Sequence, residues 1–251
     1  MADRTQSLDQ ARAELTPVGG VLRAGFNMGN ALLVTGKTPE DYPIGVARDM
    51  AEHIAQRLDV PLQCVPYPRP NKLADAVDDN IWDICLIGAE PARAQKIAFT
   101  DAYVEIKATY LVRGDSPLTS VNEVDRPGTR IIVKSGSAYE LWLTANIRHA
   151  EITRVASSEV SFQRFVNETF DVQAGLEERL LNDLPQLPGS RLLDGKFTSV
   201  QQAVGTPKKN VAAATFLSEF VEAAKRSGLV AELIERHHVK GLSVAPLTSR
   251  A

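Results

Sequence analysis

The sequence has few of the residues that build covalent or metal-linked scaffolds. Among 251 residues there are two cysteines, Cys64 and Cys85, and each lies inside a run typical of a β-strand. Two cysteines make neither a disulfide framework nor a metal site, so we expect both to be small buried apolar residues. The histidines share no metal-like spacing with Cys, Asp or Glu, and we predict no metal and no cofactor; they are His53, His149, His237 and His238.

The sequence also lacks a strong excess of charge and a long apolar run. Its formal net charge is -3, so no basic field indicates binding to nucleic acid or to an anionic membrane surface. No apolar run approaches the ~20 residues of a membrane helix, which predicts no membrane insertion. The first twenty residues have neither the basic nor the apolar part of a secretory signal, which favours a cytoplasmic protein; if a leader was removed, the protein is periplasmic.

What is present is an ordinary globular composition, 44% hydrophobic and 24% charged, enough for one large domain or two modest ones. Leu8, Ala11 and Leu15 indicate one face of a short N-terminal helix that ends near Pro17. The stretch before the first strand is too short for a helix-turn-helix unit, which argues against a transcription factor.

From Leu22 onward, segments typical of strands alternate with segments typical of amphipathic helices. Apolar residues recur at every fourth position from Val46 to Leu58, which predicts a helix. This alternation predicts a mostly parallel sheet with helices on both faces. The expected order is strand 22–27, helix 45–59, strand 62–67, helix 71–80 and strand 82–88.

A second unit repeats the same order further along the chain. After it, residues 192–208 look extended, a long helical segment is expected to break in two at Gly228, and residues 242–251 look like a tail. The expected elements of the second unit are strands 129–134, 151–156 and 170–175, and helices 137–148, 157–168 and 176–184.

This order predicts an α/β protein of two lobes joined by two crossings of the chain. A ligand would bind between the lobes at the carboxyl ends of the strands. The predicted boundaries are an N-terminal helix or tail over 1–20, lobe 1 over 21–112 and 201–245, lobe 2 over 113–200, and a tail over 246–251.

The most informative run is WDICLIGAEPARAQKIAFTDAYVE, from Trp82 to Glu105. It predicts a buried strand, a glycine turn, a short helix opened by proline, and a second extended segment. Arg93 lies just past the strand, where its planar fork of donors suits a carboxylate. The alternative is a local role, such as an ion pair with Glu90. We favour the ligand role, because the whole segment and not only the arginine fits a known pattern.

This run resembles the type II periplasmic-binding-protein fold of solute-binding protein family 3, which includes amino-acid receptors of ABC transporters. LRAGFN, RIIVKSGSAYE and FDVQAG match in the same order, so the resemblance spans roughly Leu22 to Pro207. It implies two lobes, each a mostly parallel sheet flanked by helices, joined by a two-crossing hinge. It also implies that Arg93 pairs with the α-carboxylate of a ligand.

The chain departs from the family pattern just before Arg93. It is two residues shorter there, and the family's hydroxyl residues are replaced by Gly88, Ala89, Glu90 and Pro91. We therefore expect backbone N–H groups to take a larger share of ligand binding.

The loop after the first strand carries two asparagines. The resemblance places Asn27 and Asn30 where receptors have an acidic and an aromatic residue that face the ligand. The alternative is a turn with local bonds between asparagine and backbone, and both interpretations stay open. Loss of the aromatic residue predicts a smaller or more polar ligand.

In the second lobe, the segment KSGSAYE lies between a strand and a helix. The helix start would attract an anion through its backbone N–H groups, although a serine N-cap alone explains the pattern. The resemblance favours a ligand contact, with Tyr139 as a side wall. The candidate residues are Ser135, Gly136, Ser137, Ala138 and Tyr139.

The resemblance also implies an aspartate that binds the ligand's ammonium group, and Leu176 occupies that position here. Glu177 replaces it if its side chain turns inward; the alternative, which we favour slightly, is an acidic first turn that suits the helix dipole.

The resemblance favours a binding protein for an amino acid or organic acid, of the ABC-transporter type, with a permease as partner if the chain is exported. The alternative is a cytoplasmic enzyme on the same scaffold, similar to cyclohexadienyl dehydratase. Glu90 and Glu177 are the candidate general acids for that reaction. No catalytic motif is visible, so we assign no catalytic residue and favour binding over catalysis.

Overall fold

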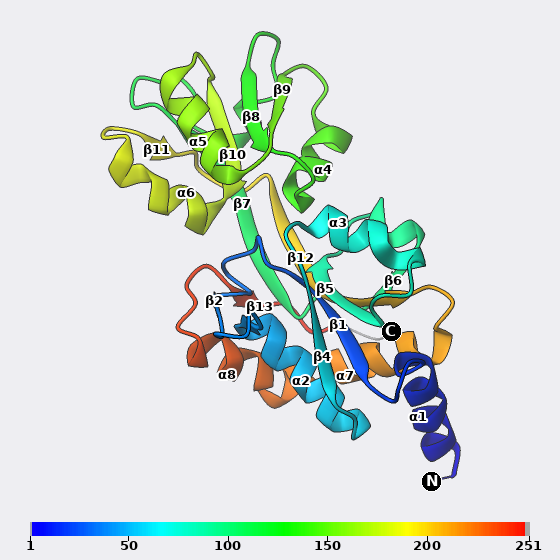
Figure 1. Cartoon of the computed structure of the whole chain (residues 1–251). Coiled ribbons are helices and arrows are strands. Elements are labelled where there is room, and N and C mark those ends of the chain that lie inside the picture. Colours follow the sequence, from blue (N-terminus) through cyan, green and yellow to red (C-terminus); the bar gives the residue numbers. More distant parts are fainter. Residues whose placement is uncertain (1, 249–251) are drawn as a thin grey trace. The chain divides into compact units, whose positions relative to one another are not determined.

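A computed structural model describes residues 2–248 of the chain, which divide into two compact units (Figure 1). Unit 2 is Ile106–Val200, and unit 1 consists of the described residues before and after it. The chain thus crosses between the units twice, at 105/106 and at 200/201; the boundaries expected from the sequence are 112/113 and 200/201. The α/β architecture predicted from the alternation of strands and helices is confirmed.

Unit 1 is built on a sheet whose first three strands are parallel. β1 pairs in parallel with both β4 and β5, and β12 then joins β5 in antiparallel orientation. The predicted break of the last long helix at Gly228 is confirmed, because this residue adopts the left-handed φ of 85° between α7 and α8. The main elements are α1 (Ala2–Leu15), β1 (Leu22–Asn27), α2 (Val46–Leu58), β4 (Leu62–Tyr67), α3 (Pro70–Asp75), β5 (Ile84–Gly88), β6 (Ile97–Phe99), β12 (Thr198–Pro207), α7 (Val211–Ser227) and α8 (Leu229–Arg236).

β5 shows why this sheet is central to the fold. All five of its residues are buried, because successive side chains point to opposite faces and both faces are covered. Ile84 and Leu86 enter the core beneath α2, α7 and α8, whereas Cys85 and Ile87 enter a second core beneath α3 (Figure 1). The uninterrupted apolar run of the sequence is therefore the signature of a strand covered on both faces.

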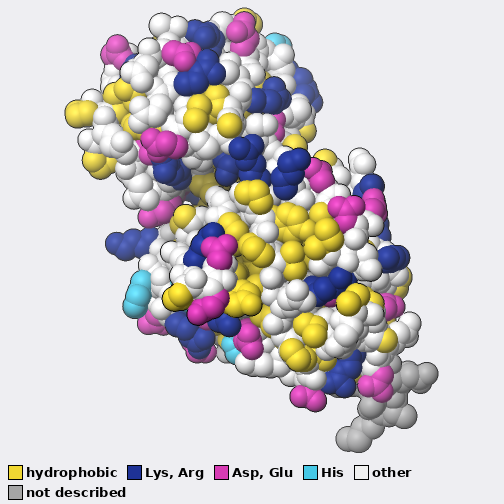
Figure 2. Space-filling model, viewed as in Figure 1, with side chains coloured by type: hydrophobic (Ala, Val, Ile, Leu, Met, Phe, Trp, Pro, Cys, Tyr) yellow, Lys and Arg dark blue, Asp and Glu magenta, His cyan; other side chains and the backbone are white. Residues whose placement is uncertain are grey.

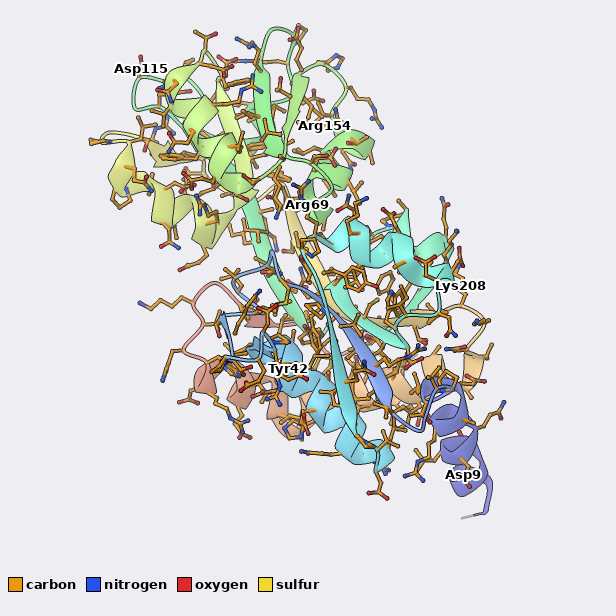
Figure 3. All side chains as sticks on the ribbon, viewed as in Figure 1. Asp9, Tyr42, Arg69, Asp115, Arg154 and Lys208 are labelled. Carbon is orange, nitrogen blue, oxygen red and sulfur yellow. The ribbon has the colours of Figure 1, made fainter. Side chains whose placement is uncertain are left out.

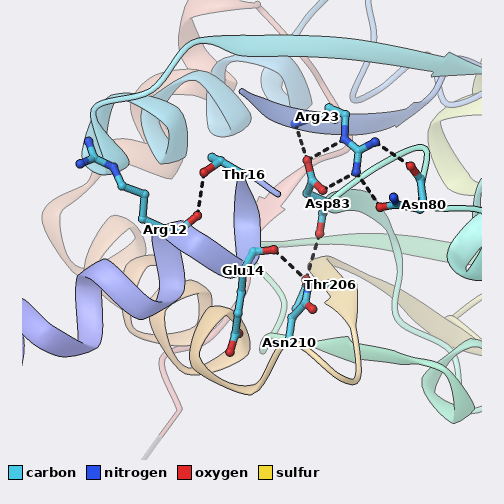
Figure 4. A network of polar contacts seen from close by, with 8 residues as sticks. All are labelled: Arg12, Glu14, Thr16, Arg23, Asn80, Asp83, Thr206 and Asn210. Atoms are coloured by element: carbon cyan, nitrogen blue, oxygen red, sulfur yellow. Dashed lines mark hydrogen bonds and ion pairs between the residues drawn. The ribbon is translucent and has the colours of Figure 1, made fainter. Parts of the chain in front are cut away.

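A buried ion pair fixes the amino-terminal edge of this sheet (Figure 4). Arg23 of β1 donates from Nε and Nη2 to the two carboxylate oxygens of Asp83 at 3.0 and 2.7 Å, and from Nη1 to the carbonyl of Asn80 at 2.6 Å. The hydrogen bond to Asp83 is the main cause that raises the pKa of Arg23. Thr206 Oγ1 donates to the carbonyl of Asp83 at 2.9 Å, so β1, β5 and β12 are joined at one point.

Unit 2 repeats the design of a parallel sheet with helices. β8 pairs in parallel with β9 and β10, and β10 pairs antiparallel with β7. Phe162 and Phe165 of α5 lie in a core on one face of this sheet, and Phe197 stacks near Trp142 of α4, with ring centroids 5.3 Å apart. The elements are β7 (Val104–Val112), β8 (Arg130–Lys134), α4 (Ala138–Asn146), β9 (Glu151–Val155), α5 (Ser158–Asn167), β10 (Val172–Leu176), α6 (Glu177–Asp183) and β11 (Arg191–Leu192).

Three expectations need correction or addition. The segment expected as a tail contains a strand, β13 (Ser243–Val244), which pairs antiparallel with β7 at Glu105 and Val104; residues 249–251 of that segment lie outside the described part of the chain. Cys85 is buried as predicted, whereas Cys64 is only half-buried, because its strand β4 is at the end of the sheet; both are free thiols. A small hairpin of β2 (Gly36–Lys37) and β3 (Pro43–Ile44) was not predicted.

The surface of each unit carries mixed charge. On the face shown in Figure 2, basic and acidic side chains are interspersed over each unit, as expected for a net charge of -3. Among the helices of residues 2–248, none combines the length and the apolar character that crossing a bilayer requires.

Candidate functional site

The carboxyl ends of three parallel strands define one edge of the unit 1 sheet. Because β1, β4 and β5 run in the same direction, their last residues, Asn27, Tyr67 and Gly88, lie at this edge. Asn27 pairs with Tyr67 in the register of the ladder. Loops that follow strands at such an edge are where α/β sheets usually bind ligands. The predicted ligand residues of lobe 1 all belong to these loops.

Arg93 lies one short turn beyond β5, at the start of a 3-10 helix (Arg93–Gln95). The residue is only 7% exposed, and its Nη1 donates to the carbonyl oxygen of Gly88 at 2.8 Å. Burial lowers the pKa of Arg93, while the nearby side chains of Glu90, Cys85 and Asp75 act in the opposite direction. An arginine remains protonated under such conditions, so the loop encloses a fixed positive charge.

Glu90 is the titratable neighbour of this charge. It is half-buried, and burial raises its pKa from 4.5 to about 7, although the positive charge of Arg93 acts in the opposite direction. The carboxyl group is therefore partly protonated near neutral pH. The interaction of Glu90 with Arg93, which the sequence suggested as a local ion pair, therefore depends on pH.

The backbone of the 88–90 segment is already engaged. Ala89 N–H donates to Gln201 O at 2.8 Å, which continues the pairing of β5 with β12, and Gly88 O accepts from Arg93. Glu90 O accepts from Ala94 N at 2.9 Å. These contacts tie the segment to β12 and to the 3-10 helix that begins at Arg93.

The two asparagines of the first loop make local bonds. Asn27 Oδ1 accepts from Gly29 N at 3.2 Å, and Asn30 Oδ1 accepts from Leu32 N at 3.2 Å. Asn30 is buried, and its carbonyl also accepts from Leu33 N at 3.1 Å. These bonds correspond to the local-turn interpretation, in which asparagine stabilises a bend by bonding backbone two residues further on.

In unit 2, the turn between β8 and α4 is held by its own side chains. Ser137 is the N-cap of α4: its Oγ accepts from Glu140 N at 3.2 Å and donates to Lys134 O at 2.9 Å. Gly136 has a φ of 70°, a conformation that glycine adopts at little cost, and its N–H donates to Glu140 Oε2 at 3.1 Å. Ser135 N donates to Val155 O at 2.8 Å.

Glu140 is the residue that fixes this turn. It is 4% exposed, and its Oε1 accepts from Arg154 Nε at 2.7 Å and from Thr144 Oγ1 at 2.8 Å (Arg154 is labelled in Figure 3). The hydroxyl of Ser137 is therefore used within the turn. The N–H groups of Ala138 and Tyr139 belong to the first turn of α4, where no helical carbonyl can accept them, so they are the donors this turn can offer.

Glu177 begins α6, as predicted, but it already has a cationic neighbour. Its Oε1 forms a salt bridge with Lys107 Nζ of β7, and the two side chains are 31% and 40% exposed. Leu176, where the resemblance implies an aspartate, is the N-cap of α6 and makes no side-chain cap bond. The salt bridge places Glu177 beside a positive charge, which weakens its pull on a ligand's ammonium group.

Sequence reasoning missed three polar residues of this region. Lys107 gave a signal, because it is a charged residue inside the mostly apolar run IKATYLV. Gln173 gave a similar signal, as the single amide inside FDVQAG, and it is 1% exposed. Glu140 gave none, because a glutamate in the first turn of a helix is ordinary.

The histidines have no shared site. His237 Nε2 lies 2.9 Å from Asp49 Oδ2, beside an ion pair of the same carboxylate with Arg236. Within residues 2–248, no three His, Cys, Asp or Glu side chains are grouped in a way that could hold a metal ion.

Comparison with known families now identifies the class of this protein. The model of the bacterial extracellular solute-binding proteins, family 3, matches residues 28–240, most of the chain. The chain belongs to this family. The resemblance recognised in the sequence is thus confirmed, and with it the function of a solute-binding protein and its fold.

Individual relatives agree with this assignment. Cyclohexadienyl dehydratase of Pseudomonas aeruginosa is 26% identical, over 94% of this chain and 89% of that protein. The crystal structure of an ancestral amino acid-binding protein, a precursor of cyclohexadienyl dehydratase, has a TM-score of 0.70 at 20% identity and covers 93% of this chain and 100% of that one. The cysteine-binding protein of Campylobacter jejuni has a TM-score of 0.70 at 16% identity, covering 92% of each chain. These two structures support the fold.

Proposed function

We propose that this protein binds a small carboxylate-bearing solute, an amino acid or an organic acid, and that Arg93 holds the carboxylate. The observation that supports this is the position of Arg93, a buried cation at the carboxyl edge of β5 in a member of a solute-binding family. A permease of an ABC transporter is the partner that this function implies if the protein is exported.

The chemistry of Arg93 suits this role. A guanidinium donates two parallel N–H bonds to one carboxylate, and such charge-assisted bonds are about twice as strong as neutral ones. The bond from Nη1 to Gly88 O holds the guanidinium at the carboxyl end of β5. A pre-ordered donor loses less rotamer entropy on binding, so the ligand gains affinity.

A thermal-shift screen of amino acids, dicarboxylates and aromatic acids tests the proposal, since a ligand that binds only the folded state raises its stability. Calorimetry then gives the affinity of each hit for the wild type and for Arg93→Ala. Each hydrogen bond to a charged group contributes about 1.5–3 kcal/mol, so we expect the variant to bind roughly 10- to 100-fold more weakly.

Two further variants make the test specific. Arg93→Lys keeps the charge but loses the planar fork, and we expect intermediate affinity. Arg57→Ala removes an exposed cation at the far end of α2 and should bind like the wild type. Equal binding by Arg93→Ala and wild type would overturn the assignment of Arg93.

A second candidate function is a dehydratase, favoured by two observations. The first is the match to cyclohexadienyl dehydratase over 94% of this chain. The second is the pKa of Glu90, which burial raises to about 7, a suitable value for a general acid that protonates a leaving hydroxyl. Loss of water from a cyclohexadienol gives an aromatic ring, so ultraviolet absorbance of the product tests this candidate. A reaction that Glu90→Gln and Glu177→Gln both leave unchanged would remove these residues as its acid.

A further inference from the structure

Unit 2 contains a small polar cavity that the proposed carboxylate site does not use. It lies where α4 and α5 begin and β10 ends, and the residues that matter for its chemistry are Lys134, Tyr139, Ser158, Ser161, Gln173 and Arg179. Its volume is ≈ 10 Å³. This is the volume open to the centre of a water-sized sphere, and by that measure one water molecule needs about 10–15 Å³. The cavity therefore suits a single oxygen atom.

Two of the lining side chains have buried polar atoms without partners among the described residues. These atoms are Ser161 Oγ and Gln173 Oε1, and both residues are 1% exposed. Gln173 also interacts with the carboxylate of Asp183, whose pKa burial raises and this interaction lowers. A buried polar atom left unsatisfied lowers the stability of the folded state, which makes an occupant favourable at this position.

The charges around the cavity decide what kind of group fits. Two cations, Lys134 and Arg179, line it, which disfavours an ammonium group. Arg179 already pairs with Asp183 and with Glu159, both at 2.9 Å, so these carboxylates are neutralised. Gln173 Oε1 can only accept a hydrogen bond, which disfavours an anion. What remains is a neutral group that donates.

A third polar partner completes the site. Tyr139 and Ser158 also line the cavity, and each carries a hydroxyl group. A buried oxygen typically needs two to four such partners. Together with Ser161 and Gln173, these hydroxyls provide both donors and acceptors.

We propose that the Ser161–Gln173 cavity binds one neutral hydroxyl group, which donates to Gln173 Oε1 and shares a hydrogen bond with Ser161 Oγ. The hydroxyl is that of a water molecule held inside unit 2.

The proposal is tested without any ligand. Ser161→Ala removes one partner of the bound oxygen and should lower the Tm by about 2–4 °C. Tyr103→Phe is a matched control, because the Tyr103 hydroxyl is also buried and without a partner among the described residues but does not line this cavity; its removal should leave the Tm unchanged or higher. A crystal structure of the wild type should show an ordered oxygen between Ser161 and Gln173.

The proposal is overturned if Ser161→Ala is as stable as the wild type or more so, or if no oxygen is seen between Ser161 and Gln173. Both measurements are made without an acid ligand, so their outcome is independent of Arg93. Unchanged acid binding in Arg93→Ala defeats only the carboxylate assignment.

Discussion

Glu90 makes the proposed carboxylate site sensitive to pH. Its carboxyl group lies close enough to Arg93 to interact with the guanidinium, and burial raises its pKa from 4.5 to about 7. When Glu90 is ionised it competes with a ligand's carboxylate for the same cation and repels it. When Glu90 is protonated, both effects disappear. We therefore expect tighter ligand binding as the pH falls through 7.

The size of the effect follows from the titration of this one group. If the ligand binds only to the form with neutral Glu90, the apparent Kd is raised by a factor of 1 + 10^(pH − 7). This factor is about 1.1 at pH 6 and about 11 at pH 8, so the Kd rises about tenfold across this range. The carboxylate of the ligand stays ionised throughout, since its own pKa is ~4.

The same shift affects stability in a defined direction. The pKa of Glu90 in the folded protein, about 7, is above its ordinary value of 4.5, so the folded state binds the proton more tightly. The resulting stabilisation is fully present below pH 4.5 and is lost as the pH rises through 7. The unliganded protein should therefore become less stable over this window, and Glu90→Gln should remove the dependence.

Calorimetry of the best ligand at pH 6, 7 and 8 measures the effect. Glu90→Gln should bind with the affinity that the wild type shows at low pH, and its Kd should not change with pH. Glu219→Gln removes the charge of an exposed glutamate on α7 and is the control. Its Kd should still rise about tenfold from pH 6 to pH 8. A wild-type Kd that is constant from pH 6 to 8, or that falls as the pH rises, would refute the reasoning.

Two predictions concern the frame that holds the unit 1 site. Arg23→Ala leaves Asp83 buried without its cation and should lower the free energy of unfolding by about 3–5 kcal/mol in urea titration, whereas Arg12→Ala, which breaks an exposed pair with Asp59, should change it by less than about 1 kcal/mol. Gly205→Ala would place a Cβ 2.5 Å from Ile97 Cγ2, so the free energy of unfolding measured by thermal unfolding should fall by about 1–3 kcal/mol. A Tm equal to that of the wild type would show that β6 moves to make room for the Cβ.

The fold could be predicted because its elements carry strong local patterns. β5 is an uninterrupted apolar run because both faces of the strand are buried. In α2 an apolar residue recurs at every fourth position because one face of the helix is buried. β13 could not be predicted, because two residues have no period of their own and their pairing depends on β7, far away in the sequence. Cys64 was misjudged for a similar reason, since the sequence does not show that β4 ends the sheet.

The site could be predicted only in part. The position of Arg93 followed from the order of strand, turn and motif, but its contact with Gly88 O depends on how the loop folds back. The turn at Ser137 was placed correctly, while the role of Glu140 in locking it needs Arg154, which lies on another strand. Sequence spacing predicts where side chains are, and it does not predict which of them are already bonded to one another.

The contacts of unit 2 bear on which acids this protein prefers. A receptor for an amino acid must compensate the ammonium group, and the resemblance assigns that role to the position of Leu176, which carries no charge. Glu177 is the nearest replacement, but Lys107 already pairs with it, so an ammonium group would have to displace that cation. Since a charge-assisted bond contributes about 1.5–3 kcal/mol, we expect its loss to make the binding of amino acids roughly 10- to 100-fold weaker than in a receptor whose acidic residue is unpaired.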